Sequence, residues 1–180
     1  MADIAAQSVK ALRDATGAGM MDAKRALVEA DGDHEAAAQA LREKGLAKAA
    51  GRSDRDNTEG AIGLAATIDR ASLVHLRCET DFSAKSDGFV SLVDELASAV
   101  LEEGETALEA RTATLDDLRL STKENCEVGR VALVEAAAGN LVDTYLHRQD
   151  GRGVNGVVVE ASGVDQETLH QIALHIAFAK

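Results

Sequence analysis

The stretch TDFSAKSDGF, residues 80–89, lies where the hydrophobic pattern of the chain changes from that of strands to that of a helix. In residues 61–79 before it, apolar side chains alternate with small or polar ones, and the sequence DRA interrupts the alternation. This period of two predicts a β-hairpin with one buried face. After the stretch, apolar residues recur at helical spacing up to residue 101, which predicts an amphipathic helix that starts at Phe89. The apolar positions of the hairpin are Ile62, Leu64, Ala66 and Ile68 in its first strand and Val74, Leu76 and Cys78 in its second.

The N-terminal part of the chain has the pattern of three short helices over residues 3–50. The sequence TGAG separates the first helix from the second, and DGD separates the second from the third, which Asp33 is expected to cap. Residues 49–60 are small and polar, as expected of a linker between domains. We therefore predict a three-helix domain over 1–52, a linker over 53–60 and a core domain over 61–180.

The C-terminal part of the chain adds three strand patterns and a final helix. The sequence TLDDLRL before them predicts a short helix, and QDGRG predicts a turn between the last two strands. Strands followed by helices predict an α+β core, in which helices pack on an antiparallel sheet. The strand patterns cover residues 126–136, 140–148 and 154–161, and the apolar face of the last helix comprises Leu169, Ile172, Ala173 and Ile176.

Composition and charge exclude several classes of protein. The chain is 46% apolar, which supports a globular core, but no uncharged apolar run reaches the length of about 18 residues that a membrane span needs. The net charge of −12 comes from the part after residue 52, because residues 1–52 hold eight basic and eight acidic side chains. So acidic a surface repels phosphate backbones, and we expect no direct binding of nucleic acid. Two cysteines, Cys78 and Cys126, form no disulfide framework, and with no signal peptide this indicates the cytoplasm.

No pattern in the chain indicates a catalytic or metal site. His170 and His175 are five residues apart on a predicted helix, so they lie on different faces, whereas helical ligand pairs prefer a spacing of three or four. Cys78 falls on the apolar face of a strand, which favours a buried, inert thiol over a nucleophile. The glycine-containing sequences GAG and GRG lack the flanking residues of a phosphate loop. We therefore expect a protein that is not an enzyme and that binds no cofactor or metal.

Two stretches together resemble the two signatures of the elongation factor Ts family. One is LRDATGAGMMDAKRALVEADGD, residues 12–33, and the other is TDFSAKSDGF after the predicted hairpin. Their order, the roughly fifty residues between them and the intervening linker also agree with that family. Further similarity runs through ENCEVGRVALVEA, YLH and GVDQETLHQIALHIAFAK, and it is weakest over 103–125 and 149–156.

The resemblance implies a function and a fold. Family members are guanine nucleotide exchange factors for the translational GTPase elongation factor Tu, from which they release GDP. The family has an N-terminal three-helix, ubiquitin-associated-like domain, which docks on the GTPase, and a core in which helices pack on a small antiparallel sheet. Both agree with the patterns described above.

The resemblance also implies roles for single residues. Asp81 and Phe82 resemble the pair that family members place beside the magnesium site of the GTPase, and His147 resembles a histidine near the same interface. Because Met20 and Met21 are adjacent, they diverge by about 100° on a helix, which predicts one core and one surface side chain. The contact of the N-terminal domain with the GTPase is assigned to Arg13, Met20, Met21 and Lys24.

The chain departs from the family pattern at several points. Ser83 stands where the family usually has Val, and the sequence STKEN at 121–125 replaces the familiar Ile-Gly-Glu-Asn. Many members continue into a second half of the core, so this chain is either a short form or a truncated one. Some short members act as dimers, which makes a homodimer a possible state.

The residues alone leave other interpretations open. Without the resemblance, Phe82 is expected to cap the hydrophobic core, and Arg13 and Lys24 are expected to be solvated charges. A different class of function is a non-catalytic adaptor that binds proteins through the N-terminal helices. For an enzyme, Cys78 or His147 would have to share a pocket with other polar groups.

Overall fold

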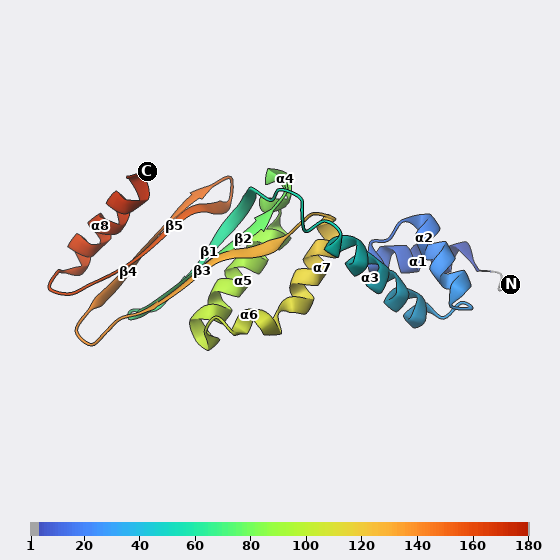
Figure 1. The fold of residues 1–180 in the computed structure, drawn as a ribbon, viewed down its shortest axis with the longest axis horizontal. Helices are drawn as coiled ribbons and strands as arrows, with labels where there is room; N and C mark the ends of the chain where they lie inside the picture. Colours follow the sequence, from blue (N-terminus) through green and yellow to red (C-terminus); the bar gives the residue numbers. More distant parts are fainter. Residues whose placement is uncertain (1–3, 180) are drawn as a thin grey trace. The chain divides into compact units, whose positions relative to one another are not determined.

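The computed structural model describes residues 4–179, and by their contacts these residues form two compact units (Figure 1). The helical unit comprises the described part of Met1–Asp54 together with Asp116–Glu124. The core unit comprises Arg55–Leu115 and the described residues from Asn125 onward. Helices and antiparallel strands are both present, which confirms the predicted α+β class. None of the helices described is both long enough and apolar enough to cross a lipid bilayer.

The helical unit begins with three helices, as predicted: α1 (Ala6–Thr16), α2 (Met20–Glu29) and α3 (His34–Ala50). Asp33 caps α3, since its carboxylate accepts hydrogen bonds from the backbone N–H groups of Glu35 and Ala36 at 2.9 and 3.1 Å. Three of the six buried core residues are alanines, which allow the helices to approach closely. The buried core residues are Val9, Leu12, Ala23, Ala26, Leu27 and Ala37.

The same unit includes the end of a later helix. Helix α7 (Thr112–Thr122) confirms the short helix predicted at TLDDLRL. Its second half lies against α3, where a Cβ atom at Gly45 would overlap the side chain of Leu120. Arg42 of α3 also forms an ion pair with Asp117 of α7. This packing had no counterpart in the sequence patterns, because the two segments are more than sixty residues apart in the chain.

The core unit is built in layers (Figure 1). Strands β1 (Glu59–Ala66), β2 (Arg70–Cys78) and β3 (Glu127–Glu135) form an antiparallel sheet in the order β1-β2-β3. Helix α5 (Asp87–Glu103) covers one face of this sheet, and the hairpin of β4 (Leu141–Gln149) and β5 (Arg152–Ala161) covers the other. Helix α8 (Gln166–Phe178) packs on the outer face of that hairpin, and the short helices α4 (Asp81–Ala84) and α6 (Ala107–Ala110) flank α5.

Strand β1 faces its neighbours differently from the predicted alternation. Ala61 and Gly63 are its buried residues and lie under α5, whereas Ile62 and Leu64 are half-buried. A Cβ atom at Gly63 would overlap the backbone oxygen of Val93, so only glycine allows α5 to approach this closely. The larger apolar side chains then point to the opposite face, where Ile62 meets the β4–β5 hairpin at Gly156.

Helix α8 also buries a different face from the predicted one. Its buried residues are Leu169, Ala173 and Ala177, which recur every four positions and pack on β4 and β5. Ile172 and Ile176, which the sequence pattern placed on the buried face, are 39% and 49% exposed. The two alanines allow the helix to lie close to the hairpin, and the isoleucines are left at the exposed edge of this buried face.

Candidate functional site

The stretch TDFSAKSDGF, residues 80–89, forms a tightly capped corner. Strand β2 ends at Cys78, and α4 begins at Asp81 after Thr80, whose hydroxyl accepts a hydrogen bond from the Ser83 N–H at 3.2 Å. The hydroxyl of Ser86 donates to the carbonyl of Ser83 at 2.8 Å and accepts from the N–H of Phe89 at 3.4 Å. One side-chain cap therefore starts α4 and another starts α5, which fixes the chain between the two helices.

Phe82 points outward from this corner and is 84% exposed. The next two residues, Ser83 and Ala84, are buried at 7% and 0% exposure, so the inner face of α4 is already occupied. Phe89, the other ring in the stretch, is fully buried at the start of α5. The alternative in which Phe82 caps the core is therefore wrong for this structure.

Asp81 is held in place by Lys85, one turn further along the chain. The Lys85 ammonium lies 2.7 Å from the carboxylate of Asp81 and 3.5 Å from that of Asp150. The hydrogen bond from Lys85, together with its charge, lowers the pKa of Asp81 below its ordinary value. Neither Lys85 nor Asp150 was predicted as a site residue, although the spacing of four between Asp81 and Lys85 was a signal for the first pair.

The β4–β5 hairpin carries His147 near the same corner. Asp150, which Lys85 approaches, is in the turn three residues after His147, and Arg152 anchors the hairpin to β1 through the carbonyl of Gly60 at 2.7 Å. His147 is exposed, and its Nδ1 lies 3.3 Å from the hydroxyl of Tyr145. Its ring centroid is 6.4 Å from that of Phe178 in α8. The structure thus groups His147 with two aromatic rings rather than with Phe82 directly.

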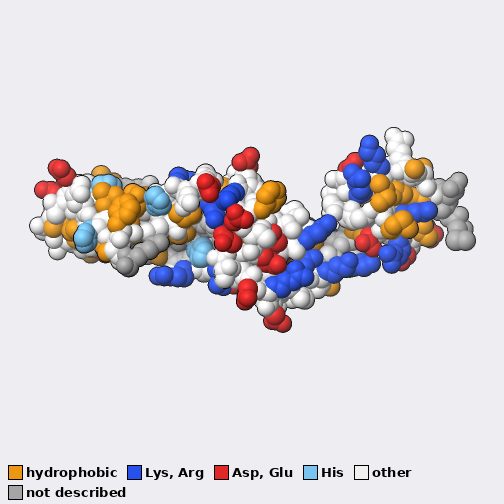
Figure 2. Space-filling model, turned by 90° about the horizontal axis from the view of Figure 1, so that it is seen from above, with side chains coloured by type: hydrophobic (Ala, Val, Ile, Leu, Met, Phe, Trp, Pro, Cys, Tyr) orange, Lys and Arg blue, Asp and Glu red, His pale blue; other side chains and the backbone are white. Residues whose placement is uncertain are grey.

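The remaining candidates lie on the helical unit. Met20 and Met21 are 46% and 71% exposed, so the expectation of one core and one surface side chain is wrong. The reason is that Ala23, Ala26 and Leu27 already form the buried face of α2. Figure 2 shows hydrophobic side chains gathered on an outer face of this unit, with Lys and Arg side chains among them.

Helical geometry places most of these exposed residues together. Met20, Met21, Lys24 and Val28 fall within a sector of about 100° around the axis of α2. Lys24 is exposed and Val28 is 37% exposed, so this sector is an apolar surface with one basic side chain, and Val28 is a member that the sequence analysis missed. Arg13 is on a different helix, in the last turn of α1, where its guanidinium lies 2.9 Å from the carboxylate of Asp14.

The two cysteines and the cavities occupy other places. Cys78 and Cys126 are both buried with no exposed surface, as predicted for Cys78. Neither the two cysteines nor His147 is among the described residues that line either of two pockets found in the helical unit. Within residues 4–179, no group of three or more His, Cys, Asp or Glu side chains is arranged to hold a metal ion.

Comparison with known proteins adds a relationship to this geometry. The family model described as Elongation factor TS matches residues 79–180, which begin immediately before the corner that carries Asp81 and Phe82. The chain belongs to the elongation factor Ts family. This confirms the resemblance inferred from the two sequence signatures.

Relatives in the elongation factor Ts family align with both units of the chain. Elongation factor Ts of Clavibacter michiganensis subsp. michiganensis is 44% identical over 189 residues, covering 99% of this chain and 68% of the relative. The protein of the same name from Sodalis glossinidius is 41% identical and covers 100% of this chain and 63% of the relative. That of Lactococcus lactis subsp. lactis is 43% identical and covers 97% and 53%. The similarity therefore includes the N-terminal helices, and the chain spans about half to two thirds of the length of these relatives.

Proposed function

We propose that this chain is a guanine nucleotide exchange factor for elongation factor Tu, and that it promotes GDP release by disturbing the magnesium and phosphate site of the GTPase. Membership of the elongation factor Ts family supports the role in translation elongation. The observation that carries the finer proposal is the ring of Phe82, which is 84% exposed on a capped corner beside Asp81.

The binding free energy that Phe82 can contribute decides whether other contacts are needed to open the nucleotide site. Burying one such ring in a pocket of the GTPase stabilises the complex by about 1.5–3 kcal/mol. Moving the nucleotide site of the GTPase from a mostly closed to a mostly open state takes about 5.5 kcal/mol. A single ring is therefore too little, and other contacts at the nucleotide site, among them that of Asp81, must supply the rest. The exposed sector of α2 with Met20 and Met21 is suited to a separate task, holding the GTPase in the complex, because thioether side chains adapt to the surface they meet.

Asp81 acts beside the ring without having to coordinate the ion. A carboxylate placed near a magnesium site perturbs the waters and side chains that hold the cation, and loss of the cation weakens the binding of the nucleotide phosphates. Lys85, which also lies near Asp150, holds this carboxylate at the corner until the GTPase is bound. By linkage, a factor that loosens GDP is itself loosened when nucleotide binds, so it is released without any chemistry of its own.

The proposal is tested by the variant Phe82→Ala. We expect it to slow release of fluorescent GDP from elongation factor Tu by about tenfold or more, because the ring contributes at least about 1.4 kcal/mol where it inserts. The matched control is Ile68→Ala, which removes an 89% exposed side chain from the turn between β1 and β2, at the far end of the hairpin from Phe82. With this control variant, elongation factor Tu should release GDP at the same rate as with the unmodified chain.

The opposite result would favour the second candidate, an adaptor that binds proteins through the helical unit. The apolar sector of α2 is the observation behind it. If Phe82→Ala leaves the release rate unchanged while changes at Met20 and Met21 abolish binding, the chain binds its partner without opening the nucleotide site. That pattern would contradict exchange activity at the Phe82 corner.

We propose the exposed edge of α8 that carries Ile172 and Ile176 as the surface of a homodimer. Both side chains are exposed beside the buried face of the helix, and Figure 2 shows hydrophobic side chains among histidines in this part of the core unit. A two-fold dimer would pair this face with itself. Sedimentation velocity should show a concentration-dependent dimer that Ile176→Glu abolishes. A monomer at every concentration would contradict the dimer.

A further inference from the structure

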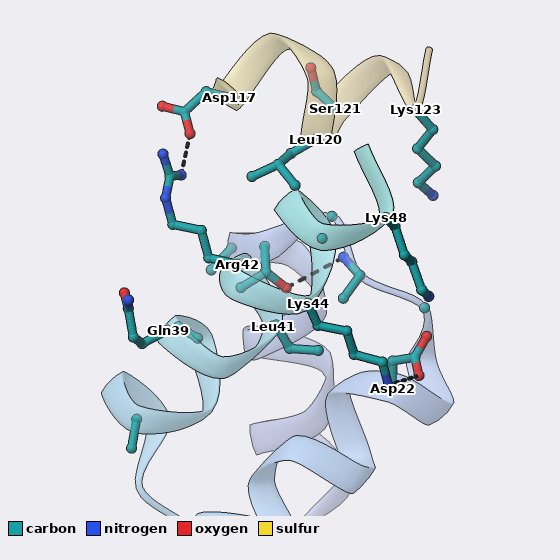
Figure 3. A pocket seen from close by; sticks show the side chains of 18 of the residues that line it. Asp22, Gln39, Leu41, Arg42, Lys44, Lys48, Asp117, Leu120, Ser121 and Lys123 are labelled. Carbon is teal, nitrogen blue, oxygen red and sulfur yellow. Dashed lines mark hydrogen bonds and ion pairs between the residues drawn. The ribbon is translucent and has the colours of Figure 1, made fainter. Parts of the chain in front are cut away.

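An open pocket of about 980 Å³ lies within the helical unit. Its walls come from α3, from the loop that joins α1 to α2 and from the second half of α7 (Figure 3). Pockets of this size hold small organic ligands. None of the described lining residues is one of the partner-binding candidates discussed above, so the pocket is a feature that the proposed exchange activity does not use.

Four charged residues of the lining neutralise one another in two ion pairs. Arg42 pairs with Asp117, and the Lys44 ammonium lies 3.6 Å from the carboxylate of Asp22 (Figure 3). The third acidic residue of the lining, Glu35, lies in the first turn of α3, about 20 Å along the helix from Lys48 in the last turn. The acidic side chains of the pocket are therefore either paired or distant from its basic end.

Three further cations of the lining have no acidic partner within ion-pair distance among the described residues. They are Lys48, Arg52 and Lys123, and no ion pair joins any of them to a described residue. The Nη1 atom of Arg52 is buried and has no hydrogen-bond acceptor among residues 4–179. A buried guanidinium N–H without an acceptor destabilises the fold, and a bound oxyanion would remove that penalty.

The backbone at Lys123 is a second, independent observation. Lys123 follows the last residue of α7 with φ of 59°, and its N–H donates to the carbonyl of Arg119 at 3.1 Å. Glycine is the usual residue at such a left-handed helix end, because a side chain strains the backbone there. In Figure 3 the Lys123 side chain lies on the same side of the pocket as Lys48, opposite the Arg42–Asp117 pair. The strained position thus adds a positive charge to the basic side.

We propose that Lys48, Arg52 and Lys123 bind the phosphate group of a small phosphorylated ligand. Three cations, one of them a guanidinium with an unused buried donor, suit a dianionic oxyanion better than a single carboxylate. The apolar parts of the wall, which include Leu41 and Leu120, leave room for the rest of such a ligand.

The same pocket fits RNA less well. Single-stranded RNA is held by aromatic side chains on which bases stack and by an extended basic surface that follows the phosphates. No aromatic residue is among the described lining residues. Basic and acidic side chains are also equal in number over residues 1–52, so the basic character is local to one side of the pocket.

The test is a titration of the full chain with inorganic pyrophosphate, followed by calorimetry and by NMR chemical shifts. We expect Lys123→Gly to weaken pyrophosphate binding by about tenfold or more, which is the typical effect of losing a charge-assisted hydrogen bond. The same variant should melt at a higher temperature than the unmodified chain, because glycine relieves the strain at this backbone position. Reduced binding in a more stable protein cannot be attributed to unfolding.

Three controls decide the outcome. Lys48→Gln should weaken binding to a similar extent, whereas Lys10→Gln, an exposed lysine of α1 away from the pocket, should bind like the unmodified chain. Malonate tests for a carboxylate site, and a short oligouridine tests for RNA. No binding of pyrophosphate at millimolar concentration, equal losses in Lys10→Gln, or tighter binding of malonate or oligouridine than of pyrophosphate would overturn the proposal.

Discussion

Asp81 owes its orientation to a single side chain. Lys85 spans Asp81 and Asp150 with its ammonium, and the hydrogen bond that it donates lowers the pKa of Asp81. We therefore predict that Lys85→Met raises the pKa of Asp81 toward its ordinary value. The measurement is an NMR titration of the Asp81 carboxyl carbon, with Lys10→Met as a control that leaves the titration unchanged. An identical titration curve in Lys85→Met would show that the pair does not form in solution.

His75 makes the stability of the core unit depend on pH. Burial of its ring, followed by the charges of Arg77 and Arg130, lowers the pKa of His75 below its ordinary value of 6.5. The unfolded chain therefore takes up a proton at this residue at a higher pH than the folded chain does. The contribution of His75 to stability is complete above the ordinary pKa and is lost as the pH falls below it.

The lowered pKa of His75 gives a second prediction, for the pH dependence of stability. Between about pH 7.5 and about pH 5.5, the free energy of unfolding should fall less in His75→Gln than in the unmodified chain, since glutamine takes up no proton. Urea denaturation at the two pH values measures the difference. His34→Gln, at an exposed position in α3, is the matched control and should keep the full pH dependence. Equal losses in all three proteins would contradict the assignment to His75.

At the scale of elements, close packing against α5 limits the size of the side chains that β1 can carry. Its Gly63 lies against the backbone of α5 at Val93, so a side chain there would force the helix away from the sheet. We predict that Gly63→Ala destabilises the chain by about 1–3 kcal/mol, as is typical for overpacking in a core. Chemical denaturation measures this loss. Gly88→Ala is the control, because a Cβ atom at Gly88 meets nothing within 4 Å and alanine favours the helix α5.

The positions of the elements followed from the sequence, but the buried faces of two of them did not. Periods of two and of 3.6 located the strands and the long helices α5 and α8 of the core unit, including the buried residues of α5. The same patterns placed Ile62 and Ile176 on buried faces, because pattern analysis weights large apolar side chains. In β1 and α8 the closest packing uses Ala61, Gly63 and Ala173 instead, since small residues allow the backbones to approach.

The candidate site was likewise predictable from the sequence only in part. The corner was predictable, because a strand pattern ends just before TDFSAKSDGF and a helix pattern starts at its last residue. The exposure of Phe82 followed only from the resemblance to elongation factor Ts, since the residues alone predicted a ring that caps the core. The pairing of Lys85 with Asp150 and the packing of Leu120 on Gly45 were not predictable. Both join segments that are more than sixty residues apart in the chain, and no local pattern records which distant segments meet.

For the whole molecule, the candidate residues divide between the two units. Asp81 and Phe82 lie on the core unit, whereas Met20 and Met21 lie on the helical unit. Because one chain carries both surfaces, contact by one raises the effective concentration of the other at the partner. Under the proposed function the two surfaces have different tasks: the methionines supply affinity that does not depend on the state of the nucleotide site, and Phe82 acts on that site itself.

This division predicts a split between affinity and maximal rate. The double change Met20→Ala with Met21→Ala should weaken binding to elongation factor Tu by about tenfold, because it removes two exposed apolar side chains from the interface. At saturating concentration of the factor, however, the same variant should promote GDP release from elongation factor Tu as fast as the unmodified chain does. Uniform binding changes the factor concentration that is needed and leaves the maximal rate unchanged. Phe82→Ala should do the reverse and lower the maximal rate. The experiment measures GDP release over a range of factor concentrations, with thermal melting to verify that each variant is folded. A lowered maximal rate in the methionine variant would show that the helical unit also takes part in opening the nucleotide site.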